Sequence, residues 1–229
     1  MEEKKKEKRI MTCAVVGKWG IGRGVYIGVA LVLFLCAGPV AQTVWAGGAT
    51  DAMKGTIDEL LRIVRDKDLK QPAKTEERRI LLEEVVSERF DYEEMSLRAL
   101  GAPWKQLSDQ EKKEFASLFR TLLVNTYREQ IETYSGEGVQ YLNERVEKAG
   151  EKEYAEVRTK IFLSDKSELK LDYKLINKDK TNWRVYDVVI QDIGLISNYQ
   201  KQFTKIIHAS SYQGLVDQLR EKSNKIKTP

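Results

Sequence analysis

Residues 182–207 read NWRVYDVVIQDIGLISNYQKQFTKII, and this stretch decides the fold class. It begins with the apolar/polar alternation of a β-strand and ends with apolar residues at the three- and four-residue spacing of an α-helix. A sheet therefore passes into a helix with almost no linker. The N-terminal part of the chain predicts helices that could cover the sheet, and the residues after this stretch predict a closing helix.

The strand predicted over 181–190 carries apolar side chains at odd and even positions alike. A regular strand would place them on two faces, with Trp183, Val185 and Val189 on one and Tyr186, Val188 and Ile190 on the other. This strand is therefore expected to be apolar on both faces.

Three further strands precede it, over residues 139–146, 153–163 and 169–176. In the last two, apolar side chains alternate with charged ones. The connections are short, with one turn around Gly150 and another over residues 177–180. Connections of this length make hairpins, so we predict an antiparallel meander with one covered face.

Helical periodicity flanks these strands on both sides. Upstream helices are predicted over 51–68, from Thr75 onward and over 92–100, and the longest follows a capping box formed by Ser108 and Glu111. Downstream helices are predicted over 195–209 and 212–225. Helices first, sheet next and helices last predict an α+β domain with a four- to five-stranded antiparallel sheet covered by N-terminal and C-terminal helices.

The first 46 residues are typical of a signal peptide. A basic segment precedes the apolar run VYIGVALVLFLCA at 25–37, and Val44-Trp45-Ala46 ends in a small-x-small pattern, so cleavage is expected after Ala46. The alternative is an uncleaved N-terminal anchor. We therefore divide the chain into a signal peptide, 1–46, and a single domain, 47–229, exported to the periplasm.

Removal of this segment changes the charge and the cysteine content. The whole chain has 39 basic and 35 acidic residues, and 32 of each remain in residues 47–229. A near-neutral domain gives no support to nucleic-acid binding. Cys13 and Cys36 both lie in the leader. The exported domain would therefore have no thiol for a nucleophile or a metal, which suits an oxidising compartment.

Signals for an enzyme are weak. His208 is the only histidine, which excludes a histidine-based triad and a multi-histidine metal site, and we expect it to be structural. Asp187 and Asp192 flank the apolar strand and are the best isolated carboxylates. We expect such an aspartate to bond backbone amides at a strand end. No catalytic residue, metal or cofactor is predicted.

Aromatic residues gather on the long helix, the sheet and the helix that follows the sheet. An ordinary packed core is one explanation. The other is an apolar cavity between sheet and helices with tyrosines at its mouth. Periodicity alone does not separate a filled core from a hollow one.

Several motifs, in order along residues 90–219, resemble those of the MlaC (toluene-tolerance auxiliary) family. They are FDYEEM at 90–95, LGAPW at 100–104, SDQEKKEFASLF at 108–119, WRVYDV at 183–188, NYQKQF at 198–203 and LVDQL at 215–219. One departure is QDIGL at 191–195, where many members read EGVSL.

The resemblance implies a periplasmic phospholipid carrier with an NTF2-like curved sheet. Such carriers hold phospholipid as cargo and maintain outer-membrane lipid asymmetry. Their partners are an outer-membrane lipoprotein–porin complex and an inner-membrane ABC transporter with a substrate-binding ring. Headgroup selectivity is expected to be low, because tail contacts dominate.

Alternation and helical facing, rather than the family, give the candidate lipid-binding residues. We expect the cavity lining to include Leu123, Tyr127, Val157, Ile161, Leu171, Tyr173, Trp183, Val185, Tyr199 and Phe203. Two other classes stay open. One is an NTF2-like enzyme acting on an apolar substrate, which would need Asp187 or Asp192 paired with a tyrosine inside the cavity. The other is a lipid-free structural adaptor between membrane complexes.

Overall fold

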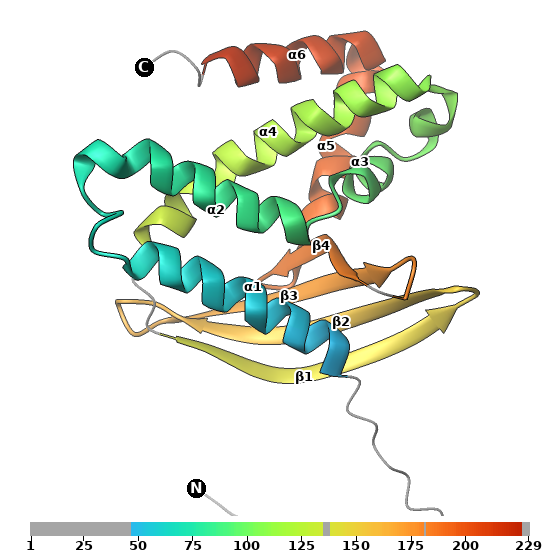
Figure 1. The fold of residues 1–229 in the computed structure, drawn as a ribbon. Coiled ribbons are helices and arrows are strands. Elements are labelled where there is room, and N and C mark those ends of the chain that lie inside the picture. The colour runs from blue at the N-terminus through green and yellow to red at the C-terminus, as the bar shows by residue number, and fades with distance from the viewer. Residues whose placement is uncertain (1–46, 135–137, 181, 226–229) are drawn as a thin grey trace, which may run out of the picture. The chain divides into compact units, whose positions relative to one another are not determined.

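The computed structural model describes residues 47–134, 138–180 and 182–225 (Figure 1). The predicted signal peptide lies outside these residues. In chain order the elements are α1 (Gly47–Arg65), η1 (Pro72–Lys74), α2 (Thr75–Arg89), α3 (Tyr92–Leu100), η2 (Ala102–Gln106), α4 (Asp109–Thr133), β1 (Gly138–Ala149), β2 (Lys152–Phe162), β3 (Glu168–Asn177), β4 (Trp183–Ile190), β5 (Ile193–Gly194), α5 (Leu195–Ala209) and α6 (Tyr212–Lys225). The predicted α+β class is confirmed.

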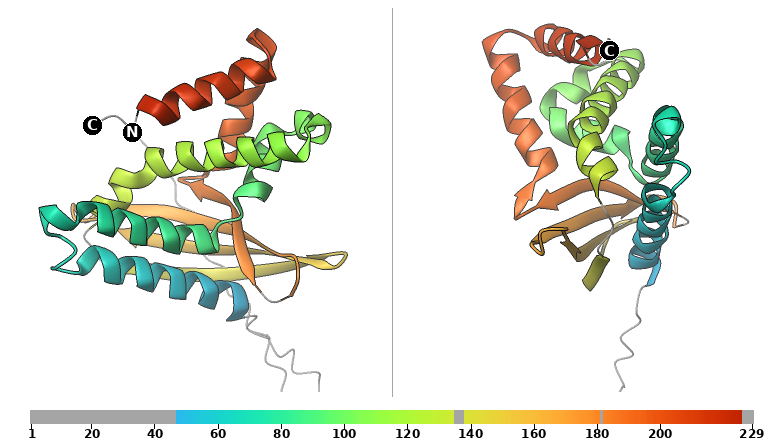
Figure 2. Two further views of the ribbon diagram at one scale, coloured as in Figure 1. Left: turned by 45° about the horizontal axis from the view of Figure 1, so that its top comes forward. Right: turned by 90° about the vertical axis from the view of Figure 1, so that its left-hand side faces the viewer.

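The five strands form one antiparallel sheet in the order β1-β2-β3-β4-β5. This is the predicted meander, to which the two-residue β5 adds a short edge next to β4. Figures 1 and 2 show the helices on one side of the sheet, with α1 lying along it. The sheet therefore has one covered face, as expected for an antiparallel meander.

A β-bulge in β4 corrects which apolar side chains of this strand were predicted to share a face. Leu175 pairs with Val185, whereas Tyr173 pairs with Val188, so Tyr186 is an extra residue without its own partner. Paired residues share a face of the sheet. Val185 and Val188 therefore both face the helices, although an odd number of positions separates them.

A second bulge reverses the facing of β1. Tyr141 pairs with Thr159 and Asn143 with Arg158, which leaves Leu142 as the extra residue. Glu144 consequently turns toward the helices, where its carboxylate accepts hydrogen bonds from the backbone N–H (2.7 Å) and hydroxyl of Thr50. The first N–H groups of a helix have no partner within it, so Glu144 caps the start of α1 from the sheet.

The helical core is centred on α4, which begins at the predicted capping box of Ser108 and Glu111. Phe115 and Phe119 are fully buried on this helix. The Phe119 ring lies 5.2 Å from Tyr199 and 5.3 Å from Phe203, both at edge-to-face angles. This aromatic cluster joins the N-terminal half of α4 to α5.

The connection between α2 and α3 is joined to β4. Phe90 forms an isolated parallel bridge with Val185, and the N–H of Asp91 donates to the carbonyl of Val185 at 2.8 Å. The Arg184 guanidinium donates to the carbonyl of Phe90 at 2.8 Å. The helices and the sheet are thus linked by backbone groups as well as by apolar packing.

Asp91 also begins α3, and its carboxylate has two kinds of donor. It accepts from the N–H of Glu94 at 3.0 Å and lies 2.8 Å from the Lys178 ammonium. Burial acts to raise the pKa of Asp91, but the hydrogen bonds from Lys178 and Glu94 outweigh it and the pKa lies below its usual value. The ionised carboxylate therefore stabilises the fold.

We expect Asp91→Asn to lower the free energy of unfolding at pH 7 by about 1 kcal/mol, because the charge-assisted bond to Lys178 is lost. Since the folded pKa is depressed, the contribution is complete above the unfolded pKa of about 4 and disappears as the pH falls through the folded value. Urea unfolding from pH 7 to pH 2 should show the two curves converging in acid. Asp192→Asn, at an exposed ion pair, is the control and should change little. A difference that persists in acid would contradict the assignment.

Phe119→Ala should lower the free energy of unfolding by about 3–5 kcal/mol, because it opens a cavity in the aromatic cluster. The matched control is Leu97→Ala on α3, whose side chain is exposed, and it should change stability by less than about 0.5 kcal/mol. Both are measured by urea denaturation followed by circular dichroism. Equal effects would show that the cluster does not organise the core.

Candidate functional site

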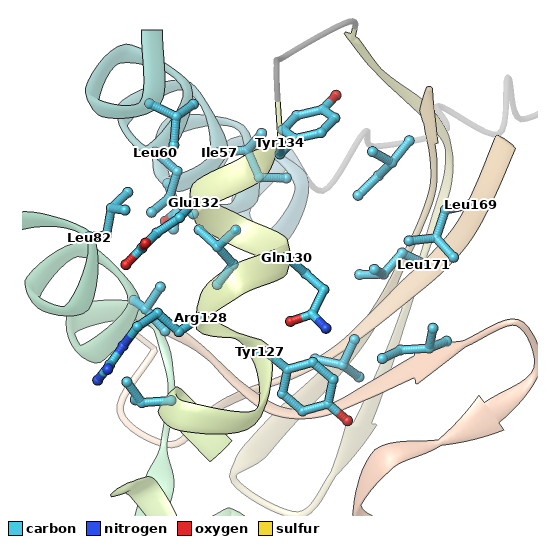
Figure 3. Close-up of a pocket in the computed structure, with 18 of the residues that line it drawn as sticks. Ile57, Leu60, Leu82, Tyr127, Arg128, Gln130, Glu132, Tyr134, Leu169 and Leu171 are labelled. Carbon is cyan, nitrogen blue, oxygen red and sulfur yellow. The ribbon is translucent and has the colours of Figure 1, made fainter. Parts of the chain in front are cut away.

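A cavity of about 690 Å³ lies between the helices and the covered face of the sheet, around the C-terminal half of α4 (Figure 3). This volume is in the range of small-molecule sites. The backbone of α4 packs against α3 and α6, whereas within the described residues no strand of the sheet packs against it as closely. The space below this half of α4 is consequently left open.

The wall is largely apolar and is built from two periodicities. Its α1 side chains recur at helical spacing and are Met53, Ile57, Leu60, Leu61 and Val64. Its β3 side chains recur at every second position and are Leu169, Leu171 and Tyr173. Val188 and Ile190 continue this surface on β4, and the bulge at Tyr186 is what turns them toward the helices.

Five of the ten residues predicted to line the cavity do so. They are Leu123 and Tyr127 on α4, Ile161 on β2, and Leu171 and Tyr173 on β3. In Figure 3 Tyr127 extends from α4 toward the sheet side, where Leu169 and Leu171 are seen. The structure therefore brings together α4 and the two strands that face it.

The other five predicted residues do not line the cavity, and this corrects their placement. Tyr199 and Phe203 belong to the aromatic cluster with Phe119. Val157 and Val185 have no exposed surface and are part of the filled core. They share the covered face of the sheet, but α1 and α3 approach β2 and β4 and leave no space there.

Trp183, the fifth of these, packs against the first turn of α1. A Cβ atom at Gly48 would lie only 2.7 Å from its indole Nε1, so the absence of a side chain at Gly48 makes this approach possible. Trp183 thus fixes the start of α1 on the sheet instead of contacting the cavity.

Helices α1 and α2 also line the cavity, which was not predicted from the sequence. Leu82 and Val86 on α2 line the cavity together with the apolar stripe of α1. That stripe is visible in the sequence at Met53, Ile57 and Leu60, but an amphipathic pattern shows only that a helix face is covered. It does not show whether a side chain or a space lies opposite.

Burial changes the pKa of three tyrosines in the cavity wall, Tyr92, Tyr127 and Tyr173. Burial raises the pKa of Tyr92 to about 12. Burial also raises the pKa values of Tyr127 and Tyr173 above their usual value. None of the three can serve as a base near neutral pH, so they provide hydroxyl groups and apolar ring faces.

The acid–base pair required by the enzyme alternative is not found in the cavity. Asp187 does not line it, and its carboxylate accepts a hydrogen bond from the N–H of Ile196 at 3.0 Å, at the start of α5. This is the backbone-bonding role expected for it. Asp192 is exposed and is paired with Lys170 outside the cavity.

The described residues contain no group of three or more His, Cys, Asp or Glu side chains that could hold a metal ion. No helix in residues 47–134, 138–180 and 182–225 is long and apolar enough to cross a membrane.

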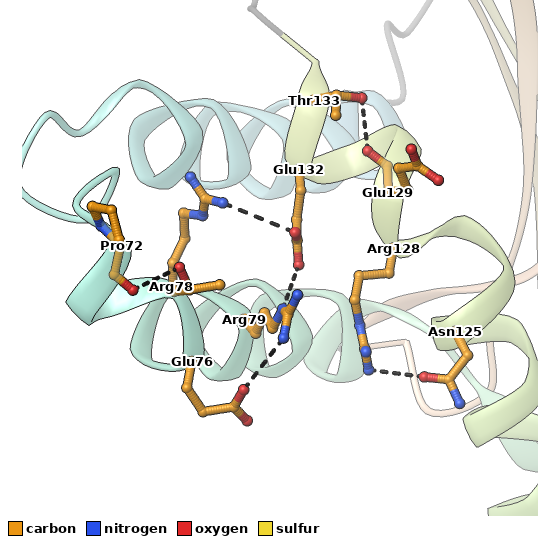
Figure 4. A network of polar contacts seen from close by, with 10 residues as sticks. Pro72, Glu76, Arg78, Arg79, Asn125, Arg128, Glu129, Glu132 and Thr133 are labelled. Carbon is orange, nitrogen blue, oxygen red and sulfur yellow. Dashed lines mark hydrogen bonds and ion pairs between the residues drawn. The ribbon is translucent and has the colours of Figure 1, made fainter. Parts of the chain in front are cut away.

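Charged residues of the cavity wall gather where α2 and α4 meet. Glu132 lies 3.0 Å from Nε of Arg79 and 3.9 Å from a guanidinium nitrogen of Arg78 (Figure 4). Arg79 and Glu132 line the cavity, as does Arg128 on the same face of α4. Glu83 on α2 also lines the cavity, so this sector of a largely apolar wall has two arginines and two carboxylates.

Fold and cavity together define an α+β protein that can enclose an apolar ligand between a curved sheet and a helical layer. The chain belongs to the MlaC family, because the family model described as "MlaC protein" matches residues 54–221. A comparison with curated proteins gives no match.

A solved structure has the same fold. It is described as a phospholipid-binding protein from Ralstonia solanacearum in complex with a phospholipid. It aligns with a TM-score of 0.67 and 24% identity, over 79% of this chain and 99% of that one.

Leu171→Trp should reduce the uptake of an apolar, environment-sensitive dye by several-fold, because the indole would occupy cavity space. Leu142→Trp is the matched control, since Leu142 is an exposed bulge residue of the same sheet that does not line the cavity. Dye titration followed by fluorescence checks both variants, with circular dichroism as a test of folding. Equal uptake by Leu171→Trp and the wild type would show that dye does not enter this cavity.

Proposed function

We propose that this protein binds a phospholipid and carries it through the periplasm, with the acyl tails held in the cavity between α1, α2, α4 and the sheet. The observation that carries the proposal is the apolar wall of this cavity. Membership of the MlaC family and the fold shared with a phospholipid-binding protein support it.

The energetics of lipid transfer explain why a carrier needs such a cavity. A lipid with two tails has roughly 30 methylene groups, and each costs about 0.8 kcal/mol when exposed to water, so free lipid in water lies about 20–25 kcal/mol above its membrane state. A protein that covers most of the tails removes most of this barrier. The apolar side chains of α1, β3 and β4 are suited to this role.

Bound lipid is cargo in this proposal and is exchanged with two membrane complexes. The partners are an outer-membrane lipoprotein–porin complex and an inner-membrane ABC transporter with a substrate-binding ring, and the exchange maintains outer-membrane lipid asymmetry. The sequence resemblance and the predicted signal peptide support these partners and the periplasmic location. Release would require the cavity to open, and separation of the sheet from the helices is the motion that we propose.

The purified protein is expected to contain phospholipid in near-stoichiometric amount, because a cavity of this kind is unfavourable when filled with water. Organic extraction followed by mass spectrometry measures the bound lipid. Delipidated protein should bind phospholipid again from vesicles, and Leu171→Trp should retain less than Leu142→Trp. If neither purified nor delipidated protein takes up lipid, the carrier function is wrong, and the lipid-free adaptor becomes the better hypothesis.

A further inference from the structure

The interface between α2 and α4 has more positive than negative charge. Arg79 is shared between Glu132 at 3.0 Å and the exposed Glu76 at 3.6 Å. Arg120 pairs with Glu83 at 2.6 Å. The whole group has four guanidinium groups, those of Arg78, Arg79, Arg120 and Arg128, and three carboxylates, those of Glu76, Glu83 and Glu132.

Arg128 is the surplus guanidinium group of this interface. Its side chain donates one hydrogen bond, to Oδ1 of Asn125 at 2.8 Å. It has no ion pair within the described parts of the chain, although it is partly buried and lines the cavity. A partly desolvated cation without a counter-ion is unfavourable, so this position is suited to an anion supplied by a ligand.

Arg78, which does not line the cavity, shows that the carboxylates of this interface do not satisfy all of its arginine donors. Its Nε atom is buried and has no hydrogen-bond partner among the described residues. Its contact with Glu132 is long, at 3.9 Å, while Arg79 holds the same carboxylate at 3.0 Å. One carboxylate therefore serves two arginines and satisfies only one of them closely.

The position of this charge within the cavity indicates what kind of ligand it suits. Arg128 and Arg79 line the same cavity as the apolar Leu60, Leu82 and Val86. Figure 3 shows Arg128 and Leu82 on the α2 side of α4, with Leu60 above them on α1. An anionic group held here would be attached to a chain that enters the apolar part of the cavity.

The other polar sector of the cavity has the opposite character. It lies at the turn between β2 and β3, where Ser164 and the exposed carboxylate of Asp165 contribute to the wall. A carboxylate disfavours an anion through like-charge repulsion. The α2–α4 sector also has two carboxylates in the wall, Glu83 and Glu132, but both are paired with arginines. Within the described lining, Arg128 is the cation without an ion pair, so its position is the favoured one for negative charge.

We propose that Arg128, supported by Arg79, binds the phosphate group of the lipid cargo. The planar guanidinium group presents paired N–H donors that match two phosphate oxygens. The inference rests on the proposed lipid-binding function and makes it more specific. The site selects lipids that carry a phosphate over neutral lipids with the same tails, whatever alcohol the phosphate bears.

The test compares two ligands that share their acyl chains, dioctanoyl phosphatidylglycerol and dioctanoylglycerol, by calorimetric titration of the delipidated protein. Arg128→Gln should weaken binding of the phospholipid about tenfold, the loss expected for a charge-assisted bond, and should leave dioctanoylglycerol unchanged. Lys112→Gln is the matched control. It also removes a positive charge and an ion pair from α4, but neither Lys112 nor its partner Asp109 lines the cavity, so both affinities should stay as in the wild type.

Three results would overturn the phosphate site while the carrier function stands. Arg128→Gln could bind the phospholipid like the wild type, or it could weaken both ligands equally. In the third, inorganic phosphate would bind at a site that is lost in Arg128→Gln, while the binding of phosphatidylglycerol would not depend on Arg128. That result would indicate a site for a free anion. A wild type that binds neither lipid would overturn the carrier function as well.

Discussion

The position of α4 is the constraint on which the rest of the structure depends. Its N-terminal half is fixed by the aromatic cluster, in which Phe115 and Phe119 pack against rings from α5. Its C-terminal half continues in the same direction as a rigid helix, above a sheet whose strands do not pack closely against it. Sharp kinks of a helix arise at proline, glycine or an inserted group, and α4 contains no proline or glycine. The helix therefore does not turn toward the sheet, and a filled core at one end becomes a hollow at the other.

The two bulges of the sheet determine which strand residues face the helices. The bulge at Tyr186 brings Val188 and Ile190 to the covered face and so extends the apolar floor of the cavity. The bulge at Leu142 brings Glu144 to that face, where it caps α1. One extra residue in each strand thus decides which side chains face the helices, and α1 contacts both the cavity and Glu144.

Charged side chains occupy only restricted parts of the cavity wall. Burial raises the pKa values of Tyr92 and Tyr173 in the cavity wall, and the buried Asp187 is engaged by the backbone of α5. The remaining charged side chains of the wall lie at its edges, at the α2–α4 interface and at the β2–β3 turn. A largely apolar interior with Arg128 in its wall is an arrangement that fits an amphipathic ligand with a single anionic group.

The sequence by itself determined the helices, the strands, their antiparallel order and the α+β class, because local periodicity and capping residues such as Ser108 fix each element. It also determined the family, through motifs spread over residues 90–219.

Only the tertiary structure decided which apolar residues line a space. Leu171 and Phe203 both lie on apolar faces, yet Leu171 lines the cavity and Phe203 packs in the aromatic cluster. The reason is physical: a periodic pattern fixes the direction of a side chain along its own element, whereas a cavity depends on the distance to the element opposite, which is set by packing elsewhere. The same holds for Val188, whose facing depends on a bulge, and for Arg128, whose lack of a partner depends on how α2 meets α4.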